Sequence, residues 1–107
     1  MTKKRKYVVM LVTAPSVASA RKIARALLDA RAAACVNIVP RIESHYRWQG
    51  KIESTHEVLL LIKTAQVKTA QVTRLVRHIH PYQVPEIIAL PISHGLPAYL
   101  RWIEENL

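Results

Sequence analysis

A short turn between two long strand-like segments is the feature that most constrains how this chain can fold. Residues 35–48 and 51–64 both have the pattern of a β-strand, and Gln49-Gly50 between them is a turn whose glycine can adopt positive φ. A strand from Cys35 to Trp48 would extend roughly 45 Å at about 3.3 Å per residue. A globule of this length is only about 30–35 Å across. The hairpin must therefore bend, with Pro40 as the expected position, or project beyond its own domain.

Large apolar side chains gather at the tip of this hairpin, where Tyr46, Trp48 and Ile52 lie within a few residues of the turn. Such side chains are costly to expose together on an unpaired edge. Pairing with a neighbouring subunit would resolve both the excess length and the exposure. The sequence therefore predicts an oligomer.

The remaining segments alternate between strand and helix patterns. An apolar, β-branched run predicts a central strand over residues 7–12, and residues 86–93 predict a further strand. Apolar residues at helical spacing predict a helix from about Ser16 to near Arg31 and a second over 72–79, ended by Pro81. Pro97 suits the first turn of a last helix. The order β-α-β-β-α-β-α predicts an α+β fold, the ferredoxin-like βαββαβ sandwich with an extra C-terminal helix and a long hairpin between its second and third strands.

Length and composition indicate one domain over residues 1–107, with a basic tail at residues 1–6. No apolar run approaches the ~20 residues that span a bilayer, so no membrane partner is expected. The N-terminus imitates a secretion signal, but its apolar run is short and ends at Thr13-Ala14-Pro15, so we interpret it as a strand. The single cysteine, Cys35, excludes an intrachain disulfide and favours a reducing compartment. It has the surroundings of a small core residue rather than of a reactive thiol.

The net charge of +9 is the main sequence signal for an anionic partner. Residues 3–6 supply four of the 16 basic residues, and the other 12 with the 7 acidic residues give +5. A solvated tail and solvated helix faces explain this charge more simply. RNA-recognition modules share the predicted fold and stack bases on aromatic residues of the sheet. The strands at 7–12 and 86–93, which we expect to be the inner pair, offer only Tyr7, so we do not expect nucleic acid as a partner.

Motifs for catalysis are sparse. The only glycines are Gly50 and Gly95, so the chain has no glycine-rich loop that would cradle a phosphate. A Ser-His-Asp arrangement would require Asp29, the only aspartate, which we expect on a helix surface. Acylphosphatases share the fold, but the chain lacks their glycine-rich arginine loop. The sequence therefore predicts a binding protein and not an enzyme.

Histidines are the candidate metal ligands, since imidazoles suit copper, nickel or zinc. A two-residue turn makes His45 and His56 diagonal neighbours on one face of the hairpin, with Glu43 beside His56. Solvated histidines are the alternative interpretation. His80 is the second candidate, but it lies two residues from His78 at a helix end, so the two rings point away from each other. Its alternative is a ring that forms local hydrogen bonds.

Glu57 and Lys63 lie at odd positions of one strand and share a face with apolar residues between them. They would form an ion pair across a subunit boundary, or they would line a pocket together with four residues from other segments: Tyr46, Trp48, His80 and Tyr82. The residues alone leave both interpretations open.

Several motifs spread over the chain resemble those of one family. They are Thr13-Ala14-Pro15, Ala33-Ala34-Cys35-Val36-Asn37-Ile38, Ser44-x-Tyr46-x-Trp48-x-Gly50-Lys51, Glu57…Lys63-Thr64, His80-Pro81-Tyr82-x-x-Pro85-Glu86-Ile87 and Tyr99-Leu100-x-Trp102. From about Tyr7 to Leu107, in order and without large gaps, the chain resembles the CutA divalent-cation-tolerance family.

This resemblance implies a ferredoxin-like subunit that assembles through its sheet edges as a tight homotrimer, similar in design to PII-type signalling proteins. It implies a cytoplasmic, non-enzymatic role in the response to divalent metal ions, without an obligatory cofactor and with copper as a proposed ligand. Some members have a cysteine where this chain has Val12 and a histidine where it has Ile79, so only His80 remains of that copper set. A small-molecule-sensing trimer of the PII type and a basic nucleic-acid-binding module stay open as alternatives. An inter-subunit cleft is also implied, with these candidate residues: Cys35, Asn37, Tyr46, Trp48, Glu57, Lys63, His80, Tyr82 and Glu86.

Overall fold

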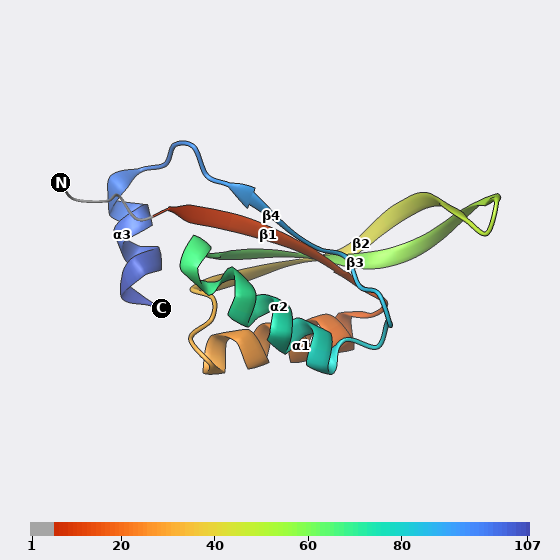
Figure 1. Ribbon diagram of the computed structural model, residues 1–107, viewed down its shortest axis with the longest axis horizontal. Coiled ribbons are helices and arrows are strands. Elements are labelled where there is room, and N and C mark those ends of the chain that lie inside the picture. Colours follow the sequence, from red (N-terminus) through yellow and green to blue (C-terminus); the bar gives the residue numbers. More distant parts are fainter. Residues whose placement is uncertain (1–5) are drawn as a thin grey trace.

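The computed structural model describes residues 6–107 and has the predicted order of elements (Figure 1). Most of the basic tail predicted at residues 1–6 lies outside the described residues. The elements are β1 (Tyr7–Ala14), α1 (Val17–Asp29), β2 (Cys35–Trp48), β3 (Lys51–Ala65), the 3-10 turn η1 (Gln66–Lys68), α2 (Thr69–Ile79), β4 (Ile87–Pro91) and α3 (Pro97–Glu105).

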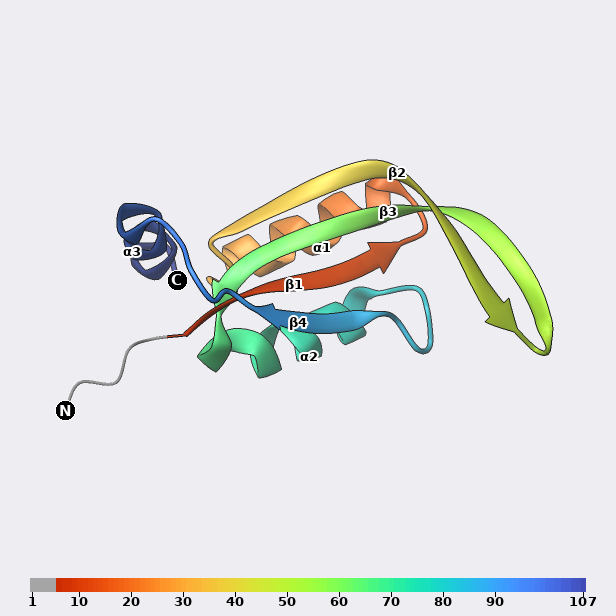
Figure 2. The same ribbon diagram turned by 90° about the horizontal axis from the view of Figure 1, so that it is seen from above.

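The strands form one antiparallel sheet in the order β2-β3-β1-β4, and α1 and α2 lie against the same face of it (Figures 1 and 2). β1 and β3 are therefore the inner strands. The prediction that residues 86–93 form an inner strand is wrong, because β4 pairs only with β1 and is shorter than predicted. β3, the inner strand in its place, carries no phenylalanine, tyrosine or tryptophan.

The core lies between the sheet and the two helices. β1 and β3 alternate in burial, and their helix-facing side chains, such as Val12, Leu60 and Ile62, are fully buried. Thr64 is the polar exception on this face, and its hydroxyl donates to the carbonyl oxygen of Ala32 at 2.6 Å.

Local signals place the ends of the helices. Ser16 caps α1, with its hydroxyl accepting a hydrogen bond from the backbone N–H of Ser19 at 3.1 Å. α1 ends at Asp29, slightly before the predicted end near Arg31, and Arg31 adopts the left-handed conformation that follows many helices. Pro97 occupies the first turn of α3, as predicted. Among residues 6–107, no helix has both the length and the apolarity to cross a membrane.

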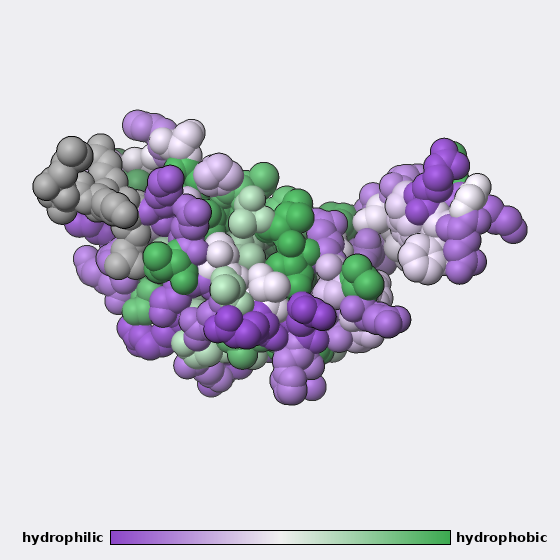
Figure 3. All heavy atoms as spheres, viewed as in Figure 1, coloured by the Kyte–Doolittle hydropathy of each residue, from purple (hydrophilic) through white to green (hydrophobic). Residues whose placement is uncertain are grey.

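The long hairpin both bends and projects. Val39 pairs with Leu59 and Ile42 with Glu57, so Pro40 and Arg41 together oppose a single residue of β3. This is a β-bulge, a position that tolerates proline and bends the strand. Beyond it, residues 42–57 pair only with each other, and we call them the hairpin arm. The arm extends away from the helices, and the molecule measures 51 × 26 × 21 Å (Figures 1 and 3).

The turn at the end of the arm has the predicted length. Gln49 and Gly50 both have positive φ, 50° and 80°, as a two-residue type I′ turn requires. The register that follows from it is confirmed, with Trp48 opposite Lys51, Tyr46 opposite Glu53, His45 opposite Ser54 and Glu43 opposite His56.

Candidate functional site

The face of the sheet opposite α1 and α2 is apolar. Leu11 of β1 lies between Leu61 of β3 and Ile88 of β4, and in the next row Val9 lies between Lys63 and Leu90. Ile88 and Leu90 are about half exposed. We call this surface the open face; its apolar residues are Val9, Leu11, Val39, Leu59, Leu61, Ile88 and Leu90. An apolar surface of this kind marks a site of interaction.

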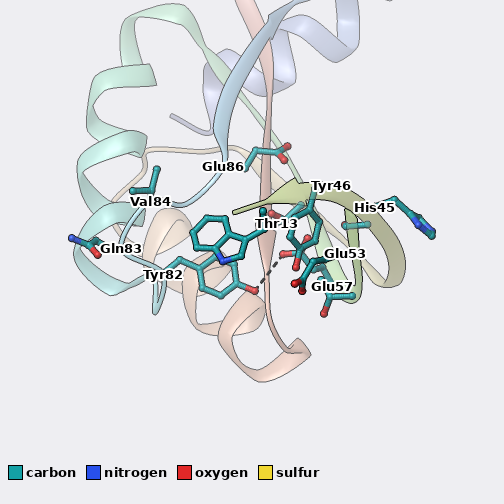
Figure 4. Close-up of a pocket in the computed structure, with 12 residues that line it drawn as sticks. Thr13, His45, Tyr46, Glu53, Glu57, Tyr82, Gln83, Val84 and Glu86 are labelled. Atoms are coloured by element: carbon teal, nitrogen blue, oxygen red, sulfur yellow. Dashed lines mark hydrogen bonds between the residues drawn. The ribbon is translucent and has the colours of Figure 1, made fainter. Parts of the chain in front are cut away.

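A groove of about 990 Å³ lies where the hairpin arm meets the loop before β4 (Figure 4). Cross-strand neighbours share one face of a sheet, so Tyr46 and Glu53 both point into the groove from the arm. The loop contributes Tyr82 and Glu86 from the other side. The full lining is Thr13, Ser44, His45, Tyr46, Trp48, Glu53, Thr55, Glu57, Tyr82, Gln83, Val84 and Glu86.

This groove is acidic, although the protein carries a net charge of +9. Three carboxylates line it, those of Glu53, Glu57 and Glu86, and no lysine or arginine is among its lining residues. The hydroxyl of Tyr82 donates to Glu57 Oε2 at 3.3 Å (Figure 4). Burial raises the pKa of Tyr82 above its ordinary value of 10.0, and the negative charge of Glu57 raises it further.

His80 supports the groove from beneath. Its side chain is buried, with Nε2 2.7 Å from the carbonyl oxygen of Thr13 and Nδ1 3.0 Å from the backbone nitrogen of Tyr82. Since the Tyr82 N–H donates to Nδ1, the ring proton resides on Nε2 and donates to Thr13. The His80 and Tyr82 rings also contact each other, with centroids 4.9 Å apart. Both ring nitrogens of His80, a predicted metal ligand, therefore form hydrogen bonds, and a metal ion would have to replace one of these two bonds.

The hairpin histidines lie on the same face of the arm, as the register predicts, but each ring has a different partner. His45 Nε2 lies 2.7 Å from Glu43 Oε1, and a guanidinium nitrogen of Arg41 lies 3.2 Å from His56 Nε2. Within the described range, residues 6–107, no three His, Cys, Asp or Glu side chains are grouped so that they could hold a metal ion.

Cys35, Asn37 and Lys63 form a separate cluster at the other end of β3. The Lys63 ammonium donates to Asn37 Oδ1, and the Cys35 thiol lies 3.9 Å from the same oxygen. Cys35 is only partly buried and lies on the open face, so the prediction of a core position is wrong, although the neighbouring Ala33 is buried. Glu57 and Lys63 are six residues apart, roughly 20 Å along the strand, and they do not pair within one subunit.

The nine residues of the predicted cleft therefore occupy three places. One part lines the groove, His80 lies below it, and the Cys35 cluster is remote from it. The groove part consists of Tyr46, Trp48, Glu57, Tyr82 and Glu86. Sequence reasoning missed Glu53, although the predicted register already placed it opposite Tyr46. It also missed Thr13, Gln83 and Val84, whose contribution depends on how the loop packs against the arm.

Fold and site together define a ferredoxin-like protein with a projecting hairpin arm, an apolar open face and an acidic groove. Residues 8–106 match the family described as CutA1 divalent ion tolerance protein. The chain belongs to this family, as the motifs predicted.

Named relatives support this assignment over most of the chain. The divalent-cation tolerance protein CutA of Thermus thermophilus is 51% identical over 98 residues, which cover 92% of this chain and 95% of the relative. Protein CutA of Mus musculus is 49% identical over 94 residues, 88% of this chain but only 53% of the relative. The chain thus spans about half the length of the mouse protein.

Solved structures confirm the ferredoxin-like fold. The Thermus thermophilus divalent cation tolerance protein superposes with a TM-score of 0.91 at 50% identity, covering 94% of this chain and 97% of that chain. The Archaeoglobus fulgidus protein, described as periplasmic, gives a TM-score of 0.90 at 42% identity, with the same coverage of both chains. A relative from Arabidopsis thaliana, 46% identical and covering 92% of this chain and 54% of its own length, is described as chloroplastic.

Proposed function

We propose that the protein is a non-enzymatic homotrimer of the divalent-cation tolerance type, with the acidic groove as a ligand-binding cleft at each subunit boundary. The observation that carries this proposal is the apolar open face, which lies beside an arm too long for its own domain. Both features are unfavourable in an isolated chain and become favourable when a second subunit covers them.

The edges of the sheet suggest how the subunits meet. β2 and β4 are the two edge strands, and each leaves one row of backbone N–H and C=O groups without a strand partner in the sheet. If β2 of one subunit pairs with β4 of the next, the contact joins two different surfaces, and three such contacts related by threefold rotation close as a ring. The arm would then lie on a neighbouring subunit, where the exposed Trp48 and Ile52 at its tip become buried.

The assembly is tested by light scattering on a sizing column at micromolar concentration. We expect three times 12.2 kDa for the unmodified chain. Leu61→Glu should give monomers, because it places a charge in the middle of the open face. Leu28→Glu is the matched control, since Leu28 is an exposed leucine on α1, and it should leave the trimer intact. A monomeric unmodified chain would refute the proposal.

The metal part of the proposal comes from the names of the relatives and from the histidines. We expect divalent copper to bind, but weakly, because copper stands at the top of the divalent affinity order while the histidine nitrogens of His45, His56 and His80 already have protein partners. Calorimetry on His80→Ala and on the His45→Ala/His56→Ala double variant separates the two candidate sites. Nanomolar copper affinity that survives all three substitutions would contradict this expectation.

We place the protein in the cytoplasm, where its single thiol would stay reduced.

A further inference from the structure

The carboxylates of the groove are spread along it instead of meeting at one point. Glu53 and Glu57 lie on the same face of β3, four residues apart, which separates them by about 13 Å along the strand. Glu86 enters from the loop on the opposite wall. In the part of the chain that the structure describes, no three ligand side chains converge closely enough for a metal ion. This spacing suits a ligand whose positive charges are themselves separated.

The surface between the two β3 carboxylates is neutral and partly aromatic. Thr55 lies midway between them, and Ser44 is its partner on β2. Tyr46 stands opposite Glu53, and Tyr82 contacts Glu57 through its hydroxyl. Aromatic faces attract cations and also pack against methylene groups, so they suit an aliphatic chain that carries amines.

The negative charge of Glu57 is not matched by a cation in the groove. Among residues 6–107, no lysine or arginine lines the groove, and the neutral Tyr82 hydroxyl donates a hydrogen bond to Glu57. Burial is the larger cause of the raised pKa of Tyr82, and the negative charge of Glu57 raises that pKa further, which is consistent with this arrangement. A cationic ligand would supply the missing counter-charge.

From these observations we propose that the groove binds a linear aliphatic polyamine, with ammonium groups at Glu53 and Glu57 and the methylene chain along Tyr46 and Tyr82. This inference rests on the proposed function, since it names the ligand class of the same cleft. A monoamine can satisfy only one carboxylate, whereas a chain with an ammonium at each end can satisfy both at once.

Calorimetry at matched ionic strength tests the proposal, with spermidine as the probe and butylamine as the single-charge comparison. We expect spermidine to bind clearly more tightly than butylamine. Glu53→Gln and Glu57→Gln should each weaken spermidine binding roughly three- to fivefold, the effect of one partly exposed ion pair. Glu43→Gln is the matched control, because it removes a carboxylate from the opposite face of the same arm and should change little.

Sizing of the same samples separates failure of this inference from failure of the proposed function. A trimer that does not bind spermidine, or that binds butylamine equally well, overturns the polyamine inference and leaves the assembly standing. Equal losses in Glu43→Gln and Glu57→Gln also overturn it, because they would show a response to overall charge alone. A monomer refutes the assembly; spermidine binding with the expected pattern of losses would then still support the groove as the site.

Discussion

Replacing His80 with alanine tests whether the ring has a structural role beneath the groove. The change removes two hydrogen bonds, to the Thr13 carbonyl and from the Tyr82 amide, each contributing about 1 kcal/mol. It also removes a ring that is only 7% exposed and contacts the ring of Tyr82, which adds about 1 kcal/mol of lost packing. We therefore expect His80→Ala to lower the free energy of unfolding by about 3 kcal/mol.

The assay is denaturant unfolding at a fixed protein concentration, because the stability of an oligomer depends on concentration. His78→Ala is the matched control, since His78 is exposed and only two residues away, and it should cost less than about 0.5 kcal/mol. His80→Gln should fall between the two, because an amide can still donate and accept. If His80→Ala costs no more than His78→Ala, the ring does not hold the loop to β1, and our assignment of its role is refuted.

Three further predictions concern the arm and the groove. Trp48→Ala should weaken the trimer by a few kcal/mol, measured as dissociation on dilution, since Trp48 is 60% exposed in one subunit and would be buried by the next; an unchanged trimer would place the tip in solvent. Gly50→Ala should lower the free energy of unfolding by about 1 kcal/mol in denaturant unfolding, because alanine is strained at a φ of +80°. The added Cβ itself should cost nothing, since no atom lies within 4 Å of it. The ultraviolet titration of Tyr82, taken as the difference from Tyr82→Phe, should have its midpoint above 10.0, and Glu57→Gln should lower that midpoint without abolishing the shift, since burial is its larger cause. Because the unfolded chain loses this proton first, stability should fall as the pH rises from about 10 through the pKa of the folded state, and a flat profile there would contradict the assignment.

The geometry of the hairpin could be predicted because it depends on local chemistry. A Gln-Gly pair between two strands permits a two-residue turn, and once the turn length is fixed, every cross-strand pair follows from it. The same reasoning placed the bend, since proline in a strand requires a bulge or an edge. These predictions needed no knowledge of how distant segments pack.

The order of the strands could not be predicted from apolarity in the same way. Residues 87–90 form a continuous apolar run, which is typical of a strand buried on both faces. In the structure the run belongs to an edge strand, and Ile88 and Leu90 are apolar because they belong to the open face. An apolar run on an open face of a sheet resembles a run that is covered within its own chain, so sequence alone does not distinguish the two.

The role of His80 depends on tertiary packing. A histidine after a helix is compatible with metal binding and with local hydrogen bonds, and the sequence leaves both interpretations open. In the structure the ring makes one local hydrogen bond, with the backbone of Tyr82, and one with Thr13, which is 67 residues away in the sequence. No spacing rule links the two residues.

The net charge of the chain and the charge of its groove have opposite signs because only two of the 16 lysine and arginine residues, Arg47 and Lys51, lie on the hairpin arm, where they are outnumbered by three glutamates, Glu43, Glu53 and Glu57. Basic residues such as Arg21, Arg25 and Arg77 lie exposed on α1 and α2, whereas Glu53 and Glu57 lie on an arm that extends away from these helices (Figure 1). At physiological ionic strength, charges more than about 8 Å apart in solvent are largely screened from each other. The groove therefore responds to its own carboxylates and not to the total of +9. A sequence-wide excess of lysine and arginine points toward anionic partners, while the site that the fold builds is complementary to cations.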